Sequence, residues 1–213
     1  MDLKLLIGGE QCAAEQSANF TRANPLTGSV VTQAAAASAA DAARAAEAAA
    51  KAFPAWSRTG PGEKRAKLLK AAEAMEARQA DFIERMVDET GATPGWAGFN
   101  VMVAASILRE AASLTTQVGG EVIPSNVPDN LAMGVRVPCG VVVGIAPWNA
   151  PIILGTRAIA TPLACGNTVV LKASEQCPGT HHLIGEVLIE AGLGDGIVNV
   201  VTNAPPQAAE VVE

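Results

Sequence analysis

Apolar residues follow two different periods along this chain. In the first half they recur at helical spacing, as where Val101, Ala104, Ala105 and Leu108 occupy positions i, i+3, i+4 and i+7 of one helix face. In the last third they form short unbroken runs, GVVVGIA, TVVLK and IVNVV. Such Val- and Ile-rich runs are typical of parallel strands that are buried on both faces. The pattern therefore predicts helices first and a parallel sheet after them.

Capping residues and prolines set the limits of the predicted helices. Ser38, with Asp41 three residues later, begins an alanine-rich surface helix that we expect Pro54 to end. Two longer helices are predicted over residues 61–91 and 94–118, each starting at a proline and ending near a glycine. The first half of the chain is therefore expected to be mainly helical.

The character of the chain changes after residue 120. Residues 121–138 combine prolines with an alternating stretch, which predicts an extended arm that leaves the body. From residue 139 on, the apolar runs alternate with helical segments, so we expect two successive βαβ crossovers and a doubly wound α/β layer. Ligands bind beyond the carboxyl ends of the strands in such sheets. This rule selects three loops, at residues 146–149, 172–175 and 202–203.

Composition and charge exclude several classes of protein. With 49% hydrophobic residues among 213, the chain is able to bury a core and is not disordered. Its net charge of −6 disfavours nucleic acid as a partner. Four cysteines without a C-x-x-C pair, and an N-terminus without a basic and apolar leader, favour a reducing, cytoplasmic location. The uncharged stretch 137–156 is interrupted by prolines, so we expect no membrane span there.

Asn149 lies where the first strand meets the next helix, two residues before Pro151. An Asn at this position commonly caps a helix, and spacing alone favours that structural role. Its amide is also suited to donate a hydrogen bond to an oxygen that develops negative charge in a reaction. Spacing thus favours the cap but leaves the role as a hydrogen-bond donor open.

Lys172 and Glu175 follow the second apolar run within three residues. Charged residues after a strand are usually its solvated end. A cation donor and a carboxylate acceptor are also the groups that hold the hydroxyls of a ribose. Spacing alone favours the solvated end.

Two binding motifs are not found. The glycines at 192–196 lack the spacing of a dinucleotide fingerprint and are interpreted as a helix cap and turn. Cys177 and His181 are four residues apart with His182 adjacent, but no further ligand occurs at suitable spacing, so no metal site is predicted.

One stretch of the sequence carries a specific family resemblance. The triplet PWN at 147–149, the turn at 162–168 and the segment KASE at 172–175 occur in the order and spacing of the aldehyde dehydrogenase superfamily. The helices and the arm before them also resemble the N-terminal half of that superfamily. Within it, WAGFNV at 96–101 and REAA at 109–112 are similar to dehydrogenases that act on aromatic aldehydes such as salicylaldehyde, vanillin or benzaldehyde.

The resemblance implies a fold, a cofactor and a reaction. Residues 1–120, as a helical part, and 139–213, as a Rossmann-like part, would form a domain for NAD, and residues 121–138 an arm that joins subunits into a homodimer or homotetramer. The family oxidises an aldehyde through attack of a cysteine thiolate, hydride transfer to nicotinamide and hydrolysis of the thioester by a water that a Glu activates. Asn149 would donate to the oxyanion. The residues implied to hold or border the cofactor are Ile145, Ala146, Pro147, Trp148, Lys172, Ser174 and Glu175.

A substrate pocket is expected on the helix that follows the triplet. Many aldehyde dehydrogenases carry a bulky Phe where this chain has Ala150, so the resemblance implies extra space there. The spacing of Ala150, Ile153, Leu154 and Arg157 places them on one helix face, which would form a slot for a flat ring. Trp96 would close the slot, and Arg157 would attract a ring hydroxyl. The structural alternatives are that Arg157 pairs with a carboxylate and that Trp96 only packs within its helix.

The catalytic part of the family pattern is not found in this sequence. The chain ends at residue 213 before the family's Gly-Ser-Thr turn, nucleophilic Cys and general base Glu, and none of its four cysteines stands in the nucleophile's context. We expect roughly the first two fifths of an enzyme, inactive alone, with a free sheet edge at residues 198–201. The alternative is a noncatalytic half-domain that serves as an interaction or assembly module.

Overall fold

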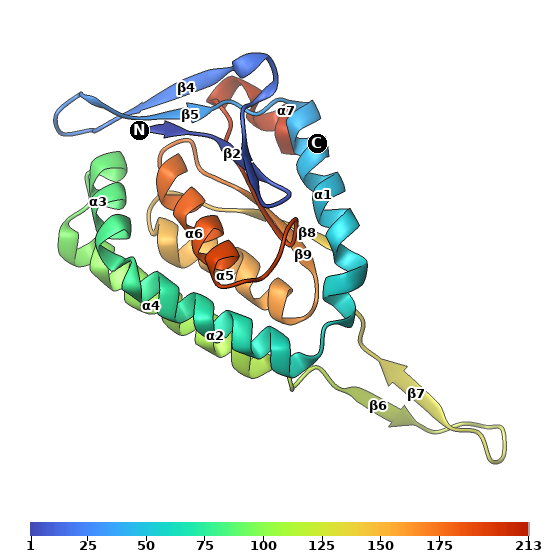
Figure 1. Ribbon diagram of the computed structural model, residues 1–213. Coiled ribbons are helices and arrows are strands. Elements are labelled where there is room, and N and C mark those ends of the chain that lie inside the picture. The colour runs from blue at the N-terminus through green and yellow to red at the C-terminus, as the bar shows by residue number, and fades with distance from the viewer. Residues whose placement is uncertain (213) are drawn as a thin grey trace.

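The computed structural model describes residues 1–212, and a mixed five-stranded sheet lies at its centre (Figure 1). Across the sheet the strands are β3 (Glu10–Cys12), β2 (Leu5–Ile7), β10 (Val198–Val201), β9 (Thr168–Lys172) and β8 (Val141–Ile145). β8, β9 and β10 are parallel and in register, so Ile145, Lys172 and Val201 end side by side. The parallel layer predicted from the apolar runs is confirmed.

The edge of the sheet differs from the prediction. β10 is not a free edge, because β2 pairs with it antiparallel and β3 pairs with β2. In the described chain the parallel side of the sheet ends at β8 instead. Val143 and Ile145 on this strand are each 57% exposed, so the prediction of burial on both faces holds for β9 and β10 but not for β8.

Helices cover both faces of the central sheet, and they are α1 (Ala39–Arg58), α2 (Pro61–Ala77), α3 (Gln79–Thr90), α4 (Pro94–Leu114), α5 (Pro151–Ala164), α6 (Pro178–Glu190) and the short α7 (Ala208–Val212). α5 and α6 pack on one face and share their apolar core with α2 and α4. α1 packs on the other face through Ala45 and Ala49, with α7 beside it (Figure 1). No helix in residues 1–212 combines the length and apolarity needed to cross a membrane.

α1 is a surface helix, as predicted, but it does not end at Pro54. Its start is as expected: the Asp41 N–H donates to Ser38 Oγ at 3.3 Å, and the Ser38 N–H donates to the Asp41 carboxylate at 3.0 Å. The helix then passes through Pro54 and continues for another turn. That turn is anchored, because Trp56 is buried and its Nε1 donates to the Leu163 carbonyl at 3.2 Å. Tertiary contacts thus offset the loss of one helical hydrogen bond at the proline.

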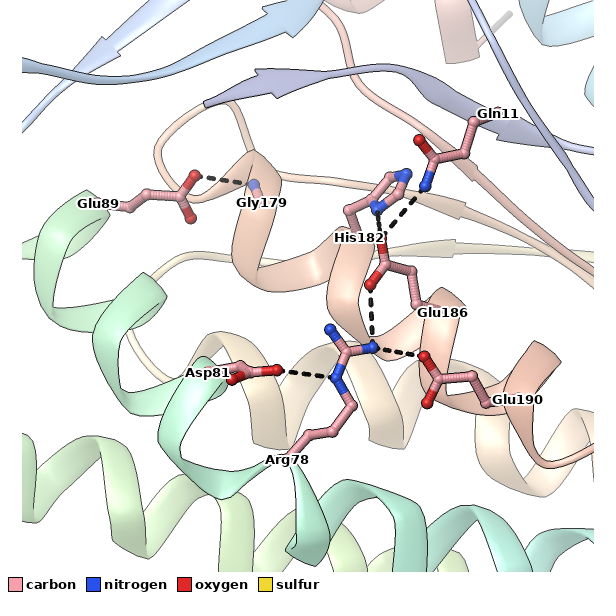
Figure 2. Close-up of polar contacts among 8 residues, drawn as sticks. All are labelled: Gln11, Arg78, Asp81, Glu89, Gly179, His182, Glu186 and Glu190. Carbon is pink, nitrogen blue, oxygen red and sulfur yellow. Dashed lines mark hydrogen bonds and ion pairs between the residues drawn. The ribbon is translucent and has the colours of Figure 1, made fainter.

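The helix predicted over residues 61–91 is two helices, α2 and α3. The break falls at Arg78, whose φ of −96° and ψ of 20° leave the helical region. Its guanidinium pairs with Asp81 on α3 at 2.9 Å and with Glu190 on α6 at 2.8 Å (Figure 2). The helix predicted over 94–118 corresponds to α4, which ends earlier, at Leu114.

The N-terminal segment contains strands that the hydrophobic pattern does not reveal. A second sheet has the order β1 (Asp2–Leu3), β5 (Val30–Ala35) and β4 (Asn19–Ala23). These strands are short and rich in alanine and polar residues, so their periodicity is weak. Just after β10, the Thr202 hydroxyl donates to the Ala35 carbonyl at 2.6 Å, and the Ala37 N–H donates to the Thr202 carbonyl at 2.8 Å. The N-terminal segment therefore closes the carboxyl end of β10.

The residues between α4 and β8 form a hairpin that projects from the body (Figure 1). Its two antiparallel strands are β6 (Gly120–Ile123) and β7 (Ala132–Val135). The extended arm expected at residues 121–138 is thus a two-stranded ribbon. Several of its apolar side chains are exposed, including Val122 and Leu131 at 71% each.

Candidate active site

The carboxyl ends of β8 and β9 lie next to each other and bring two of the predicted loops together. Residues 146–151, which run up to and include the first residue of α5, are called the Asn149 loop below, and residues 173–177 the Glu175 loop. Ile145 is in register with Lys172, and the Ala146 N–H donates to the Lys172 carbonyl at 3.3 Å. The two loops are therefore neighbours because their strands are parallel neighbours.

The side chain of Asn149 does not cap the following helix. The N-cap residue of α5 is Ala150, and no side chain makes a capping hydrogen bond there. Asn149 is exposed, and its backbone carbonyl accepts a hydrogen bond from Trp96 Nε1 at 3.3 Å. The capping interpretation is therefore wrong. The loop is held through its backbone, and the amide remains available as a neutral donor.

The residues before Asn149 form an accessible apolar strip at the end of β8. Ile145 is 57% and Trp148 is 55% exposed, and Pro147 is exposed as well. Ala146 between them is buried. Exposed apolar groups beside convergent polar ones are typical of a small-molecule site.

Lys172 and Glu175 form an ion pair at the end of β9. Lys172 Nζ lies 3.6 Å from Glu175 Oε2, and Lys172 is only 8% exposed. A solvated strand end would leave the lysine in water, so that interpretation is wrong for Lys172. Ser174 is also buried, and its Oγ accepts a hydrogen bond from the Gln176 N–H at 3.2 Å.

A groove of about 330 Å³ opens beside Lys172 on the face of the sheet that α1 covers. Val143, Val170 and Val201 form its floor, and alanines of α1 and residues of α7 form its walls. Lys172 is the one cation among these lining residues. A cation with a nearby carboxylate at the edge of an apolar groove suits a sugar with hydroxyl groups.

A buried histidine connects the two loops. His181, on the first turn of α6, has no exposed surface. Its Nδ1 accepts a hydrogen bond from the Ser174 N–H at 3.0 Å, and its Nε2 lies 3.1 Å from the Pro151 carbonyl. Burial is the main cause that lowers the pKa of His181 to about 4, and the charge of Lys172 lowers it further. The ring is therefore neutral near pH 7.

Sequence reasoning missed this link, because it considered His181 only as a metal ligand beside Cys177. The thiol Sγ is 3.9 Å from the His181 Nδ1, whose lone pair already accepts the Ser174 N–H. Among the residues that the structure describes, no group of three or more His, Cys, Asp or Glu lies where it could hold a metal ion. A signal that could have drawn attention to the link is a polar ring at the start of an otherwise apolar helix.

A carboxylate from another helix caps the start of α6. Glu89 on α3 is buried and accepts a hydrogen bond from the Gly179 N–H at 2.8 Å (Figure 2). It accepts a second from the Thr180 N–H at 2.9 Å. The hydroxyl groups of Thr180 and Thr32 also donate to it, at 2.7 and 2.8 Å. Burial raises the pKa of Glu89, and these donated hydrogen bonds oppose that rise. The turn that carries His181 is therefore fixed from the side of α3 as well.

The predicted substrate face lies at the start of α5, a helix that packs against α4. Ala150 and Ile153 are 9% and 7% exposed, Leu154 is half-buried and Arg157 is exposed. Arg157 takes part in none of the salt bridges among the described residues, so the structural alternative of a paired carboxylate is not supported.

Two aromatic residues of α4 stand beside this face. Trp96 and Phe99 stack with their ring centroids 5.5 Å apart and an interplanar angle of 18°. They pack within their helix, as one interpretation held, yet they remain 42% and 45% exposed. The Trp96 indole also donates to the Asn149 carbonyl, so it lies directly beside the Asn149 loop.

The third predicted loop does not join the site. Thr202 and Asn203 are 1% and 0% exposed, and the N-terminal segment covers them. Of the three predicted loops, only those at the ends of β8 and β9 therefore contribute to the site of the described chain.

The model of the aldehyde dehydrogenase family matches residues 12–213, almost the whole chain. This chain belongs to the aldehyde dehydrogenase family. The resemblance drawn from the motifs around Asn149 and Lys172 is thus confirmed. Among curated aldehyde dehydrogenases, a vanillin dehydrogenase from Pseudomonas fluorescens is 62% identical over 213 residues, which is 100% of this chain and 44% of that protein.

Solved aldehyde dehydrogenase structures have the same fold. A salicylaldehyde dehydrogenase from Pseudomonas putida G7, complexed with salicylaldehyde, superposes with a TM-score of 0.96 at 44% identity, covering 99% of this chain and 44% of that one. An NAD-dependent benzaldehyde dehydrogenase from Corynebacterium glutamicum gives 0.93 at 35% identity, covering 97% of this chain and 45% of that one. The chain therefore spans less than half the length of these aldehyde dehydrogenases.

Proposed function

We propose that the enzyme to which this chain belongs oxidises an aromatic aldehyde to the carboxylic acid, with NAD as the hydride acceptor. The observation that supports this most directly is the exposed Asn149, whose side chain caps no helix and whose backbone is held beside the Lys172–Glu175 pair. Vanillin, salicylaldehyde and benzaldehyde, which name the similar enzymes, are all aromatic aldehydes.

The Asn149 amide is proposed as the oxyanion donor. Attack of a nucleophile on an aldehyde carbonyl places negative charge on its oxygen, and a neutral N–H donor stabilises that charge without transferring a proton. The hydrogen bond from Trp96 holds the backbone of Asn149 in place before the reaction. Such preorganisation lowers the cost of stabilising the charge when it forms.

Lys172 and Glu175, at the end of β9, are proposed to bind NAD. Lys172 is a buried cation donor and Glu175 a carboxylate acceptor, which together match the two hydroxyls of the adenosine ribose. Ser174 is proposed to contact the cofactor from the same loop. When bound, the nicotinamide supplies the carbon that accepts the hydride. The residues proposed to border the cofactor at the end of β8 are Ile145, Ala146, Pro147 and Trp148.

The ring of the substrate is proposed to lie between Trp96 and the α5 face. The small side chain of Ala150 is proposed to leave room next to Asn149, and Ile153 and Leu154 are proposed to supply an aliphatic wall. Arg157 is exposed and outside the salt bridges of the described chain, so it is suited to attract a ring hydroxyl or phenolate.

The catalytic thiol is proposed to lie outside this chain. Cys177 is buried, and this burial is the main cause that raises its pKa well above the ordinary value. Cys139 and Cys165 precede β8 and β9 and line a groove at the amino ends of these strands, away from the Asn149 loop. Cys12 lies on β3, at the opposite edge of the sheet. Purified residues 1–213 are therefore expected to form no NADH from an aldehyde, and NADH formation by them would contradict the assignment.

The β6–β7 hairpin is proposed as an arm that joins subunits. Exposed apolar side chains on a projecting ribbon lose their contact with water when a partner subunit covers them. We expect a homodimer or a homotetramer, and light scattering on the complete gene product measures which.

Steady-state kinetics on the complete gene product test the proposed activity. We expect kcat/KM for vanillin, salicylaldehyde or benzaldehyde to exceed that for acetaldehyde by about tenfold or more, because a flat ring fills the slot and a methyl group does not. NAD is expected to be preferred over NADP. Higher kcat/KM for acetaldehyde, or equal values for the two cofactors, would contradict the proposal.

A further inference from the structure

We propose that His181 is a positioning residue that couples the Asn149 loop to the Glu175 loop, so that oxyanion donor and ribose carboxylate are set in one arrangement. This inference rests on the proposed function for the roles of Asn149 and Glu175. The coupling itself rests on two hydrogen-bonding contacts of one buried ring, at 3.0 Å to the Ser174 N–H and 3.1 Å to the Pro151 carbonyl.

The two contacts fix the tautomer of the ring. A backbone N–H such as that of Ser174 donates, so Nδ1 must present a lone pair. In a neutral imidazole the proton is then on Nε2, which donates it to the Pro151 carbonyl. A doubly protonated ring would direct an N–H at the Ser174 N–H, and it would stand near the Lys172 ammonium. The site is thus built for one neutral tautomer.

The surrounding helices leave room for a ring of this size and little more. His181 is fully buried where its own helix, α6, packs against α5. A Cβ added at Gly155 on α5 would come within 3.0 Å of His181 Cδ2 and 2.7 Å of Ile184 Cδ1. The absence of a side chain at Gly155 therefore admits the imidazole. The Glu89 carboxylate, which caps α6, holds the ring's own turn in place.

The contacts lie next to the groups proposed to act on ligands. Pro151 is two residues after Asn149, and Ser174 is directly before Glu175. Without the ring, the buried Ser174 N–H would lose its acceptor, and the carbonyl of Pro151, the first residue of α5, would lose one of its donors. An unsatisfied buried group is costly enough to shift the backbone that carries it. Loss of the ring should therefore displace both loops together, although neither contact involves a ligand.

His182 provides a matched control on the same helix. It is also buried, at 1% exposure, but its Nδ1 faces Glu186 at 3.2 Å and not the two loops. Glu186 in turn pairs with Arg78, as Figure 2 shows. Replacing His182 therefore removes an imidazole from the same helix without touching either contact of His181.

Two conservative variants of His181 separate its two contacts. In His181→Asn the amide reaches only as far as Nδ1, so the bond from Ser174 is kept and the bond to Pro151 is lost. In His181→Gln the amide reaches as far as Nε2, so the reverse holds. His181→Leu loses both contacts.

The test measures kcat per titrated active site, the Kd for NAD and hydrogen exchange of both loops in the complete gene product. We expect His181→Asn to lower kcat about tenfold with the NAD Kd unchanged within twofold, because a displaced catalytic group loses rate steeply. We expect His181→Gln to raise the NAD Kd several-fold with a smaller loss of kcat. His181→Leu should show both effects and faster exchange in peptides covering 146–151 and 173–177, whereas His182→Leu should show neither.

Three outcomes would overturn the coupling. One is that the folded His181 variants keep wild-type kcat and NAD affinity. Another is that His181→Asn and His181→Gln change kcat and the NAD Kd to the same extent. The third is that His182→Leu loosens both loops as much as His181→Leu does. If His181→Leu does not fold, the Asn and Gln pair decides. Failure of the wild-type protein to oxidise aldehydes would contradict the proposed function, while hydrogen exchange still tests the coupling.

Discussion

The Asn149 loop and the Glu175 loop are neighbours in space but are built in opposite ways. In the Asn149 loop, Pro147, Trp148 and Asn149 are exposed, and the hydrogen bonds from Trp96 and His181 hold the backbone rather than these side chains. In the Glu175 loop most side chains are buried. Ser174 and Cys177 lie in the interior, and only Glu175 and its neighbour Gln176 are half-buried.

One part of this sheet edge thus presents free side chains, and the other part uses its side chains for support. The side chains of residues 147–149 stay free because Trp96 and His181 bind the carbonyl groups of this loop from outside. The Glu175 loop uses its own side chains and backbone for support, with one carboxylate left at the surface. Substitutions of the exposed residues 147–149 in the first loop should therefore change activity with little effect on stability, and substitutions in the second loop should change both.

Removal of the Asn149 amide should have the largest effect. Asn149→Ala in the complete enzyme is expected to lower kcat by about a hundredfold or more, as loss of one oxyanion donor does, while the NAD Kd stays nearly unchanged. Because the side chain caps nothing, the midpoint of unfolding should not move. Asn149→Asp keeps the shape, loses the donor and adds a negative charge that repels the oxyanion, so it should be at least as slow. Weakened NAD binding or a loss of fold would favour a structural role instead.

Acid should weaken the support of the Glu175 loop through His181. The unfolded chain binds a proton at a pKa of about 6.5, whereas the folded ring binds it at about 4. Stability is therefore fully present above pH 6.5 and falls as the pH drops towards 4. From pH 7.5 to pH 5 we expect the free energy of unfolding of the wild type to fall by about 2 kcal/mol more than that of His181→Gln. Denaturant unfolding at both pH values measures this, and equal losses would contradict it.

The charge of Glu175 should set the choice of cofactor. Its carboxylate would face the additional phosphate of NADP, and the repulsion is moderate because the side chain is 30% exposed. Glu175→Gln is expected to narrow the preference for NAD over NADP in kcat/KM by about tenfold. Asp81→Asn, far from the site on α3, is a matched control for the lost charge. An unchanged cofactor ratio in Glu175→Gln would show that Glu175 does not contact the ribose.

The smallest expected effect concerns substrate choice at Ala150. Ala150→Phe should crowd the aromatic ring beside Asn149 and narrow the preference for aromatic over short aliphatic aldehydes by about three- to tenfold. The position is 9% exposed, so some loss of stability should accompany the change. A variant that keeps its full aromatic preference would show that the slot lies elsewhere.

Much of the fold was predictable because its signals are local. The Val-rich runs became β8, β9 and β10, and Ser38 with Asp41 marked the start of α1, since strand burial and helix capping depend on residues close in sequence. The motifs around Asn149 and Lys172 were likewise sufficient to indicate the family. The errors were long-range: α1 continued through Pro54 because Trp56 binds Leu163, and β2 covered β10 from nearly two hundred residues away in the chain.

What the sequence determined about the site was its chemical inventory: an amide at Asn149, a cation and a carboxylate at Lys172 and Glu175, and the strand ends that hold them. Only the tertiary structure decided which of these groups are free to act. It left the Asn149 side chain exposed and free of any capping bond, buried Lys172 and placed His181 between the two loops. The physical reason is that burial and hydrogen-bond partners depend on residues from distant segments. A pattern along the chain records spacing, but not which groups pack against it.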